Sequence, residues 1–144
     1  LYKYPPSLTE YPEVQIHRGI YLKKIAKKIS AKHIVEIGTA RGWQSLLFAK
    51  YIEEGKFNGR VFTCDIVGSD EPIFEITIKP GELFTRSQLW GKYEFSDLIT
   101  FVHGDSSKLK EYLQNLEPCK IDLVFVDGEH TEKAVMQDFY NISP

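Results

Sequence analysis

The stretch His33-Ile-Val-Glu-Ile-Gly-Thr-Ala-Arg-Gly42 decides the fold of this 144-residue chain. Its first five residues form a short, mostly apolar run that is typical of a buried strand. A glycine-bearing turn follows at once, and residues 43–54 then carry apolar side chains at helical spacing, with Leu47 and Tyr51 on one face. A strand that passes through a glycine turn into a helix is the repeating unit of a parallel α/β sheet.

The same alternation of strands and helices continues on both sides of this stretch. An amphipathic helix is expected at 15–30, and further strands at 60–66, 99–103 and 121–126. Helical patterns follow these strands at 82–93, 109–116 and 131–140. We therefore predict an α/β, Rossmann-like fold of three layers (αβα), in which helices cover both faces of a mainly parallel sheet.

One connection is longer than the others. Residues 67–81 are rich in turn residues around a β-prone run at 73–78, which Pro80 and Gly81 are expected to end. The whole segment 67–90 exceeds a plain crossover, and long connections of this kind are often functional. We interpret it as a candidate flap over a substrate site.

Composition and charge narrow the class of protein. Apolar residues make up 42% and charged residues 26% of the chain, as in ordinary soluble domains. We divide the chain into a proline-rich N-terminal arm, 1–14, and one domain, 15–144. The net charge of −2 gives no field that would attract nucleic acid or an anionic membrane. No signal peptide or membrane-length apolar run is visible, so we expect a cytoplasmic location and a buried, reduced Cys64. Homo-oligomer formation stays open.

Polar residues follow each expected strand at its carboxyl end. Asp65 ends the second strand, Gly104-Asp105-Ser106 follows the third, and Asp127-Gly-Glu-His130 follows the fourth. Ligands of open parallel sheets bind beyond these ends. The sequence therefore predicts one ligand site that is assembled from all four strand ends.

The glycine loop after the first strand indicates the kind of ligand. Gly38 allows a tight turn, and Gly42 would let a ligand approach the backbone at the helix start. A dinucleotide fingerprint needs a middle glycine where this chain has Ala40. The acidic Glu36 suits a ligand with an amino group, such as the amino-acid end of S-adenosylmethionine. A purely structural turn is the alternative.

The other strand ends fit a nucleoside. A carboxylate at Asp65 can accept hydrogen bonds from both ribose hydroxyls, in NAD as well as in S-adenosylmethionine. Asp105 or Ser106 can reach an adenine edge, although Ser106 and Ser107 also suit the N-cap of the next helix.

Taken in order, these segments resemble the motifs of class I S-adenosylmethionine-dependent methyltransferases. V-E-I-G-T-A-R-G resembles the first motif, C-D-I the acidic second and F-V-H-G-D-S the third, and the resemblance spans about residues 15–140. Because V-F-V-D-G-E-H follows the fourth strand, the chain is most similar to catechol O-methyltransferase-like and cephalosporin-hydroxylase-like small-molecule enzymes. The resemblance implies cofactor-binding roles for Glu36, Gly38, Thr39, Gly42, Asp65, Asp105 and Ser106.

The resemblance also implies two catalytic residues. Asp127 matches the position of an aspartate that binds a divalent cation such as Mg²⁺, and His130 stands where those enzymes have a lysine base. An imidazole can accept a proton from a hydroxyl group near neutral pH. The remaining metal ligands of such enzymes follow a fifth strand of a seven-stranded sheet. Only four strands are expected here, so we expect part of that sheet and a chain that continues beyond Pro144.

The sequence therefore predicts an S-adenosylmethionine-dependent methyltransferase that acts on an oxygen of a small-molecule or sugar-type acceptor. The alternatives are a nicotinamide-dependent oxidoreductase, whose NAD would share Asp65, and a non-catalytic module that keeps the fold.

Overall fold

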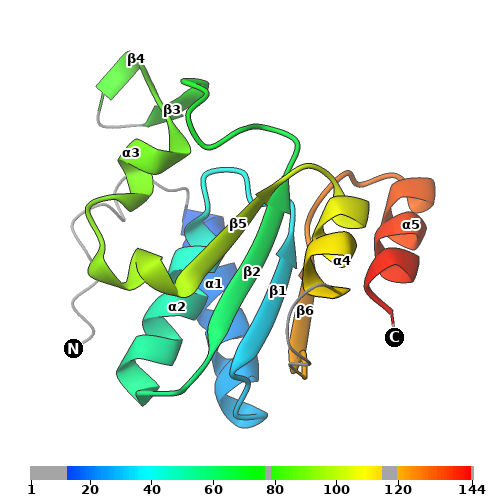
Figure 1. Ribbon diagram of the computed structural model, residues 1–144. Helices are drawn as coiled ribbons and strands as arrows, with labels where there is room; N and C mark the ends of the chain where they lie inside the picture. Colours follow the sequence, from blue (N-terminus) through cyan, green and yellow to red (C-terminus); the bar gives the residue numbers. More distant parts are fainter. Residues whose placement is uncertain (1–12, 77–78, 115–119, 144) are drawn as a thin grey trace.

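The computed structural model describes residues 13–76, 79–114 and 120–143, and these form an α/β fold (Figure 1). Its elements are, in chain order, α1 (Glu13–Lys28), β1 (His33–Ile37), α2 (Trp43–Gly55), β2 (Arg60–Asp65), β3 (Phe74–Ile76), β4 (Lys79–Phe84), α3 (Arg86–Trp90), the 3₁₀ helix η2 (Glu94–Leu98), β5 (Ile99–His103), α4 (Ser106–Gln114), β6 (Leu123–Val126) and α5 (Glu132–Ile142).

Four strands form one parallel sheet in the order β5-β2-β1-β6. Helices α1 and α2 cover one face, and α4 and α5 cover the other (Figure 1). The predicted three-layer, Rossmann-like fold is therefore confirmed. Because β6 pairs with β1 and β5 pairs with β2, the crossover from β5 to β6 passes over the two central strands. The topological switch point lies beside the carboxyl end of β1, where such folds bind ligands.

The alternation of side chains along β1 decides which residues face which helix layer. Ile34 packs with Ala26 and Phe48 on the side of α1 and α2, whereas Val35 and Ile37 pack with Leu109 on the side of α4. Because successive strand residues point to opposite faces, Glu36 points to the same side as Ile34, toward α2. The chain thus directs a carboxyl group into one of its two cores.

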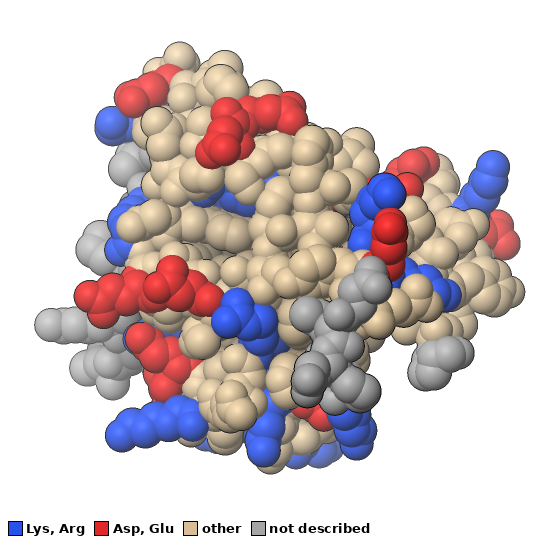
Figure 2. Space-filling view, viewed as in Figure 1, with Lys and Arg blue, Asp and Glu red and all other residues tan. Residues whose placement is uncertain are grey.

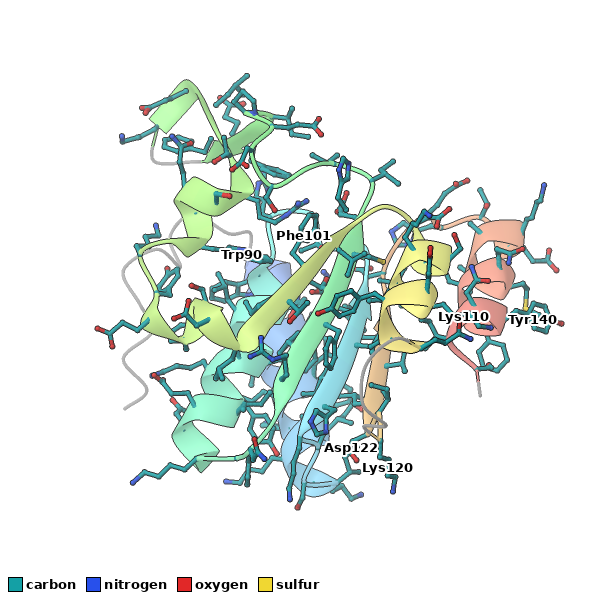
Figure 3. All side chains as sticks on the ribbon, viewed as in Figure 1. Trp90, Phe101, Lys110, Lys120, Asp122 and Tyr140 are labelled. Carbon is teal, nitrogen blue, oxygen red and sulfur yellow. The ribbon has the colours of Figure 1, made fainter. Side chains whose placement is uncertain are left out.

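The opposite end of the sheet is fixed by an aspartate. The Asp122 carboxylate accepts hydrogen bonds from the backbone N–H groups of Lys32 and His33, at 2.8 and 3.0 Å. Asp122 lies just before β6, at the end of the sheet away from the strand arrowheads (Figure 3). These bonds hold the start of β1 against β6, so the register of the two strands is set at this end.

The segment after β2 differs from the prediction. Pro80 and Gly81 do not end a strand but lie within β4, which pairs antiparallel with β3 as a separate two-stranded ribbon. The ribbon stands apart from the main sheet, above α3 (Figure 1). A ribbon with open edges tolerates proline because its outward N–H groups need no partner.

The predicted helix at 82–93 is also shorter than expected. It begins only after Thr85, whose side chain accepts a hydrogen bond from the Gln88 N–H at 3.0 Å. The Gln88 side chain in turn accepts from the Thr85 N–H, which completes a capping box. The T-x-x-Q pattern of residues 85–88 in the sequence marks this start.

The remaining boundaries agree to within a few residues or lie outside the described residues. The strands at 33–37 and 99–103 have the predicted bounds, whereas the strand predicted at 121–126 begins at Leu123. Of the predicted arm, residues 1–12 lie outside the described part of the chain, and Glu13 and Val14 begin α1. Leu116 and Cys119 also lie outside it.

The surface shows no single sign of charge. Acidic and basic side chains both appear on the face in Figure 2, with basic groups at its lower end and acidic groups on the ribbon at the top. Within the described residues, no helix is both long enough and apolar enough to cross a membrane.

Candidate functional site

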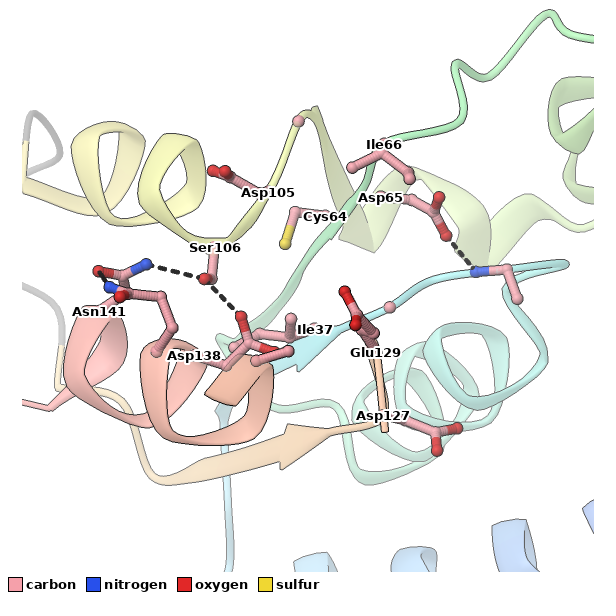
Figure 4. Close-up of a pocket in the computed structure, with 16 residues that line it drawn as sticks. Ile37, Cys64, Asp65, Ile66, Asp105, Ser106, Asp127, Glu129, Asp138 and Asn141 are labelled. Atoms are coloured by element: carbon pink, nitrogen blue, oxygen red, sulfur yellow. Dashed lines mark hydrogen bonds between the residues drawn. The ribbon is translucent and has the colours of Figure 1, made fainter. Parts of the chain in front are cut away.

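A cavity of about 570 Å³ opens at the carboxyl ends of the four parallel strands (Figure 4). Its volume lies in the range usual for small-molecule sites. The predicted residues that line it are Gly38, Asp65, Asp105, Ser106 and Asp127. The structure thus brings one residue or more from each of the four strand ends to a single cavity.

A second, smaller pocket of about 50 Å³ lies on the other side of Gly38 and Asp127. Glu36, Thr39 and Gly42 line it, together with Arg18 of α1 and Gln44 of α2. All predicted cofactor-binding residues therefore border one of the two spaces. Because Gly38, Ala40 and Asp127 line both, the two spaces adjoin.

Gly38 is required by the close packing of two strand ends. Its φ is +88°, and a Cβ atom there would lie 2.3 Å from the backbone oxygen of Asp127. Only glycine combines that backbone conformation with such a close approach. Gly38 therefore sets how closely the glycine loop can approach the end of β6.

At Gly42 the close neighbour is a protein side chain, whereas the sequence predicted a ligand there. Its φ is +80°, and a Cβ atom would lie 2.1 Å from Nε1 of the Trp90 indole. The same indole N–H donates to the Arg41 carbonyl at 3.0 Å. The close approach at this glycine is thus made by a protein side chain from α3, and Trp90 closes one side of the loop.

The backbone amides of the glycine loop are already engaged. The N–H groups of Gly38 and Thr39 both donate to the Cys64 carbonyl, at 3.0 and 3.1 Å. The Gly42 N–H donates to the Thr39 carbonyl at 2.7 Å, and the Ala40 N–H donates to Asp65. A loop that cradles a pyrophosphate needs such amides to face the ligand. These four N–H groups therefore donate within the protein instead of facing a pyrophosphate.

Glu36 is buried below the smaller pocket, with 1% of its surface exposed. The Ser45 hydroxyl donates to its Oε2 atom, and the Thr63 hydroxyl approaches the same atom at 3.2 Å. Burial raises the pKa of Glu36 to about 8, against the lowering effect of these hydroxyl groups, and the nearby Asp127 raises the pKa further. Thr39 extends the network through its hydroxyl, which lies 2.7 Å from that of Thr63.

Asp65 lies at the edge of the larger cavity with both carboxylate oxygens engaged. Oδ2 accepts from the Ala40 N–H at 2.6 Å, and Oδ1 accepts from the Val67 N–H at 2.8 Å. Arg86 forms an ion pair with it at 3.4 Å. A carboxylate offers about four lone-pair sites, so these contacts leave capacity for a ligand.

The sequence left two roles open for Asp105 and Ser106, which are contact with the adenine and capping of the next helix. Asp105 caps α4, because its Oδ1 accepts from the N–H groups of Ser107 and Lys108 at 3.0 and 3.3 Å. The Ser107 hydroxyl also donates to it, and these bonds lower the pKa of Asp105. Ser106 is buried and donates to Asp138 of α5 at 2.6 Å, while the Asn141 amide donates to Ser106 (Figure 4).

Asp127 points away from the larger cavity, as Figure 4 shows, and pairs with Arg18. The guanidinium Nη2 atom lies 2.9 Å from Asp127 Oδ2. Within the described residues, no group of three or more His, Cys, Asp or Glu side chains is arranged to hold a metal ion. In this structure the negative charge of Asp127 is balanced by Arg18, and a divalent cation there would need further ligands from outside the described residues.

His130 is exposed and lines neither space. The structure does not use it as a helix cap, because Thr131 is the N-cap of α5 and accepts from the Ala134 N–H at 3.3 Å. His130 directly follows Glu129, which lines the cavity and points toward it (Figure 4).

Several site residues were missed by sequence reasoning. Arg18 and Gln44 lie on helices, where helical spacing alone does not mark a site residue, and Glu129 lies between Asp127 and His130. Gln44 has a clear signature in the structure. It is 3% exposed, and neither its amide nitrogen nor its amide oxygen has a hydrogen-bond partner. A buried amide without partners is costly unless a ligand satisfies it.

The chain is similar in sequence to known methyltransferases. Residues 35–144 match the sequence model of a family described as a methyltransferase domain. A protein of Arabidopsis thaliana assigned as a caffeoyl-CoA O-methyltransferase is 28% identical over 117 residues, which cover 81% of this chain and 44% of that protein.

Solved structures share the fold. An O-methyltransferase of Bacillus cereus, solved in complex with S-adenosylhomocysteine (SAH), is 17% identical and has a TM-score of 0.65, over 95% of this chain and 55% of the other. TomG of Streptomyces achromogenes, an O-methyltransferase involved in tomaymycin synthesis and solved with S-adenosylmethionine, is 19% identical with a TM-score of 0.60, over 89% and 52%. The chain spans about half the length of these proteins.

Proposed function

The chain belongs to this methyltransferase domain family, and from that premise we propose that it binds S-adenosylmethionine and transfers the methyl group to an oxygen atom of a small-molecule acceptor. The observation that carries the proposal is the pair of adjoining spaces at the strand ends. One is large enough for a nucleoside, and the other presents charges of both signs to an amino acid.

The smaller pocket suits the amino-acid end of the cofactor. Its lining includes Gln44, whose buried amide lacks partners, and Arg18, whose buried Nε atom also has none. These N–H groups can donate to a carboxylate. Glu36 and Asp127 border the same pocket and can accept from an ammonium group. The carboxylate of a zwitterion would therefore satisfy N–H groups that the protein leaves unpaired.

The larger cavity suits the nucleoside. Asp65 borders it with about one lone-pair site that its three protein contacts leave free, and a ribose hydroxyl can donate to that site. Ile66 is 76% exposed at the same cavity and offers an apolar surface for a base. Asp105 and Ser106 would border the adenine. Gly38, Thr39 and Gly42 keep the loop between the two spaces in its observed shape.

The chemistry requires alignment more than activation. When bound, S-adenosylmethionine supplies a methyl group that its sulfonium already activates for in-line displacement by an acceptor oxygen. The residues of this chain would hold the reactants in line, and such positioning is worth about 7–11 kcal/mol. For removal of the hydroxyl proton we propose His130, which is exposed and lies beside Glu129 at the cavity. A divalent cation at Asp127 would need further ligands from outside the described residues, and the proton transfer proposed for His130 does not pass through one.

The nicotinamide alternative has less support. Asp65 suits both cofactors, but the loop amides that would face a pyrophosphate donate to Cys64, Thr39 and Asp65 instead. We place the reaction in the cytoplasm, in keeping with the free, buried thiol of Cys64, whose pKa burial raises to about 12.

A ligand titration tests the proposal. Thermal unfolding of the chain is followed with increasing SAH and, separately, with increasing NAD. We expect SAH alone to raise the melting temperature, because a ligand that binds only the native state stabilises it. Asp65→Asn should weaken this effect, whereas Asp97→Asn, which changes an exposed carboxylate away from both spaces, should not. Stabilisation by NAD and not by SAH would overturn the proposal.

Turnover needs a separate measurement. Candidate acceptors that carry hydroxyl groups are incubated with the chain and S-adenosylmethionine, and their intact masses are recorded. A gain of one methyl group supports the enzyme. Binding of SAH without any methylated product across phenolic, catechol and sugar acceptors would favour the non-catalytic module.

A further inference from the structure

Arg86, the first residue of α3, has no exposed surface and is the largest fully buried side chain in the described part of the chain. Arginine is almost never fully buried unless its charge is paired. It lines neither the cavity nor the smaller pocket and lies behind Asp65. Its burial therefore calls for an explanation other than ligand contact.

The guanidinium group joins the loops after two neighbouring strands. Nε donates to the Ala40 carbonyl at 2.7 Å, and Nη1 donates to the Val67 carbonyl at 2.8 Å. Nη2 lies 3.4 Å from Asp65 Oδ2, the same oxygen that accepts from the Ala40 N–H at 2.6 Å. Ala40, Asp65 and Arg86 thus form a closed ring of polar contacts.

The ring holds a strained residue. Ala40 has a φ of +46°, in the left-handed region that side chains with a Cβ atom disfavour. Such a conformation persists only where its surroundings fix it. Here both backbone polar groups of Ala40 are held, the N–H by Asp65 and the carbonyl by Arg86. Ala40 lines both spaces of the site, so the ring fixes the loop where it faces a ligand.

Aromatic rings hold the guanidinium in place. Its carbon lies 4.5 Å from the centre of the Phe101 ring and 5.3 Å from that of Phe74. Trp90 meets Phe101 edge-on, with 6.3 Å between ring centres, and both are labelled in Figure 3. Phe74 lies on β3, Phe101 on β5 and Trp90 on α3, so three elements outside the glycine loop determine where Arg86 sits.

We propose that Arg86 is a positioning residue for the cofactor, which orients the Asp65 carboxylate and the Ala40 backbone so that the remaining lone-pair site of Asp65 faces a ribose hydroxyl. The inference rests on the proposed function, because it takes S-adenosylmethionine as the ligand. Arg86 acts through Asp65 and does not touch the ligand itself. The role requires the planar, forked guanidinium, because it contacts Ala40, Val67 and Asp65 with three separate nitrogen atoms, whereas lysine has one.

The test compares two ligands that differ only in the ribose. Calorimetric titration gives the affinity for SAH and for its 2′,3′-dideoxy analogue. In the wild-type chain we expect the first to bind about tenfold more tightly or better, the value of a charged hydrogen bond. Arg86→Lys should reduce this ratio as far as Asp65→Asn does, and the double variant should reduce it no further.

The control separates positioning from general weakening. Tyr51→Phe removes a buried hydrogen bond to the Ala26 carbonyl in the core, away from Asp65. This variant should leave the ratio of the two affinities, for SAH and for its dideoxy analogue, unchanged whatever its effect on stability. If Arg86→Lys lowers both affinities by one factor and keeps the ratio, the residue is merely structural and the inference is overturned.

Two further outcomes are decisive. If the wild-type chain binds neither ligand, the proposed function fails and this inference fails with it, whereas binding with an unchanged ratio in Arg86→Lys overturns this inference alone. If Arg86→Lys does not fold, Phe101→Leu removes the nearer ring and leaves the charge and its partners. A reduced ratio in that variant supports the inference, and an unchanged ratio overturns it.

Discussion

The guanidinium of Arg18, on the first helix, lies 2.9 Å from the carboxylate of Asp127, which follows the last strand of the sheet. Residues from near the two ends of the described chain therefore meet beside the glycine loop. The arginine also lies over the Phe125 ring, with its guanidinium carbon 5.6 Å from the ring centre. This contact positions a cation in the lining of the smaller pocket.

Arg18→Met should weaken cofactor binding much more than it weakens the fold. The Arg18 side chain is 39% exposed, so loss of its ion pair should cost at most about 1 kcal/mol of unfolding free energy. Loss of a charged donor in the smaller pocket should reduce SAH affinity by about tenfold or more. Calorimetry and urea denaturation measure the two effects. Lys23 lies on the same helix as Arg18 and forms an ion pair with Glu54 of α2, and Lys23→Met should leave the affinity unchanged. An equal loss of affinity in that variant would point to helix packing instead.

Glu36→Gln should change how stability depends on pH. Burial raises the pKa of Glu36 from 4.5 to about 8, so between these values the native state keeps a proton that the unfolded chain releases. Native stability therefore falls as pH rises through this window, by up to about 1.4 kcal/mol per pH unit. The glutamine variant should lack this slope. Its free energy of unfolding should therefore rise relative to that of the wild type from pH 5 to pH 8. Urea titrations across that range test it, with the exposed Glu53→Gln as control. Equal slopes in wild type and variant would contradict a raised pKa.

Gly42→Ala and Gly81→Ala form a matched pair. Both glycines have φ near +80°, but an added Cβ meets the Trp90 indole at Gly42 and nothing within 4 Å at Gly81. Gly81→Ala should cost about 1–2 kcal/mol for the left-handed backbone alone. Gly42→Ala should cost about 2–5 kcal/mol, because crowding adds to the same penalty. Denaturant midpoints measure both, and equal losses would show that Trp90 does not press on the loop.

His130→Ala should lower turnover by about a hundredfold or more, the usual contribution of a general base. Cofactor affinity should stay within about twofold, because the residue lines neither space. Single-turnover rates and SAH titration separate the two quantities. Lys133→Ala, an exposed change on the same segment, serves as control. A parallel loss in both quantities would place His130 in the cofactor pocket, and unchanged turnover would remove it from the mechanism.

The parallel core could be predicted from the sequence because burial leaves a readable pattern. The runs at 33–37 and 99–103 are short and mostly apolar between polar flanks, and their bounds agree with β1 and β5. β3 lies within the β-prone run at 73–78, but β4 left no such pattern, because it is largely exposed and its pairing with β3 buries little. Pro80 and Gly81 consequently looked like a boundary when they are parts of a strand.

The site was predictable only where a strand end supplied it. Glu36, Asp65, Asp105 and Asp127 follow from the position of each strand in the chain. Arg18 and Gln44 come from helices that reach the pocket only once the layers pack, and helical periodicity does not reveal which turn faces a ligand. Arg86 could not be predicted for another reason. Charged residues are expected on the surface, so the sequence gives no sign that this arginine is buried.

The strand order β5-β2-β1-β6 has a consequence for how the protein is made. The ribosome releases β1, β2 and β5 before β6. One edge of β1 therefore has no partner until β6 is made, because Ile34 pairs with Leu123. Until then an apolar strand edge stays unpaired in the nascent chain, where it can associate with other chains. Pairings between distant residues also form slowly. Asp127 arrives with that last strand, so the ligand site can be assembled only when synthesis has passed it, and a chaperone that shields β1 in the interval should raise the yield of native protein.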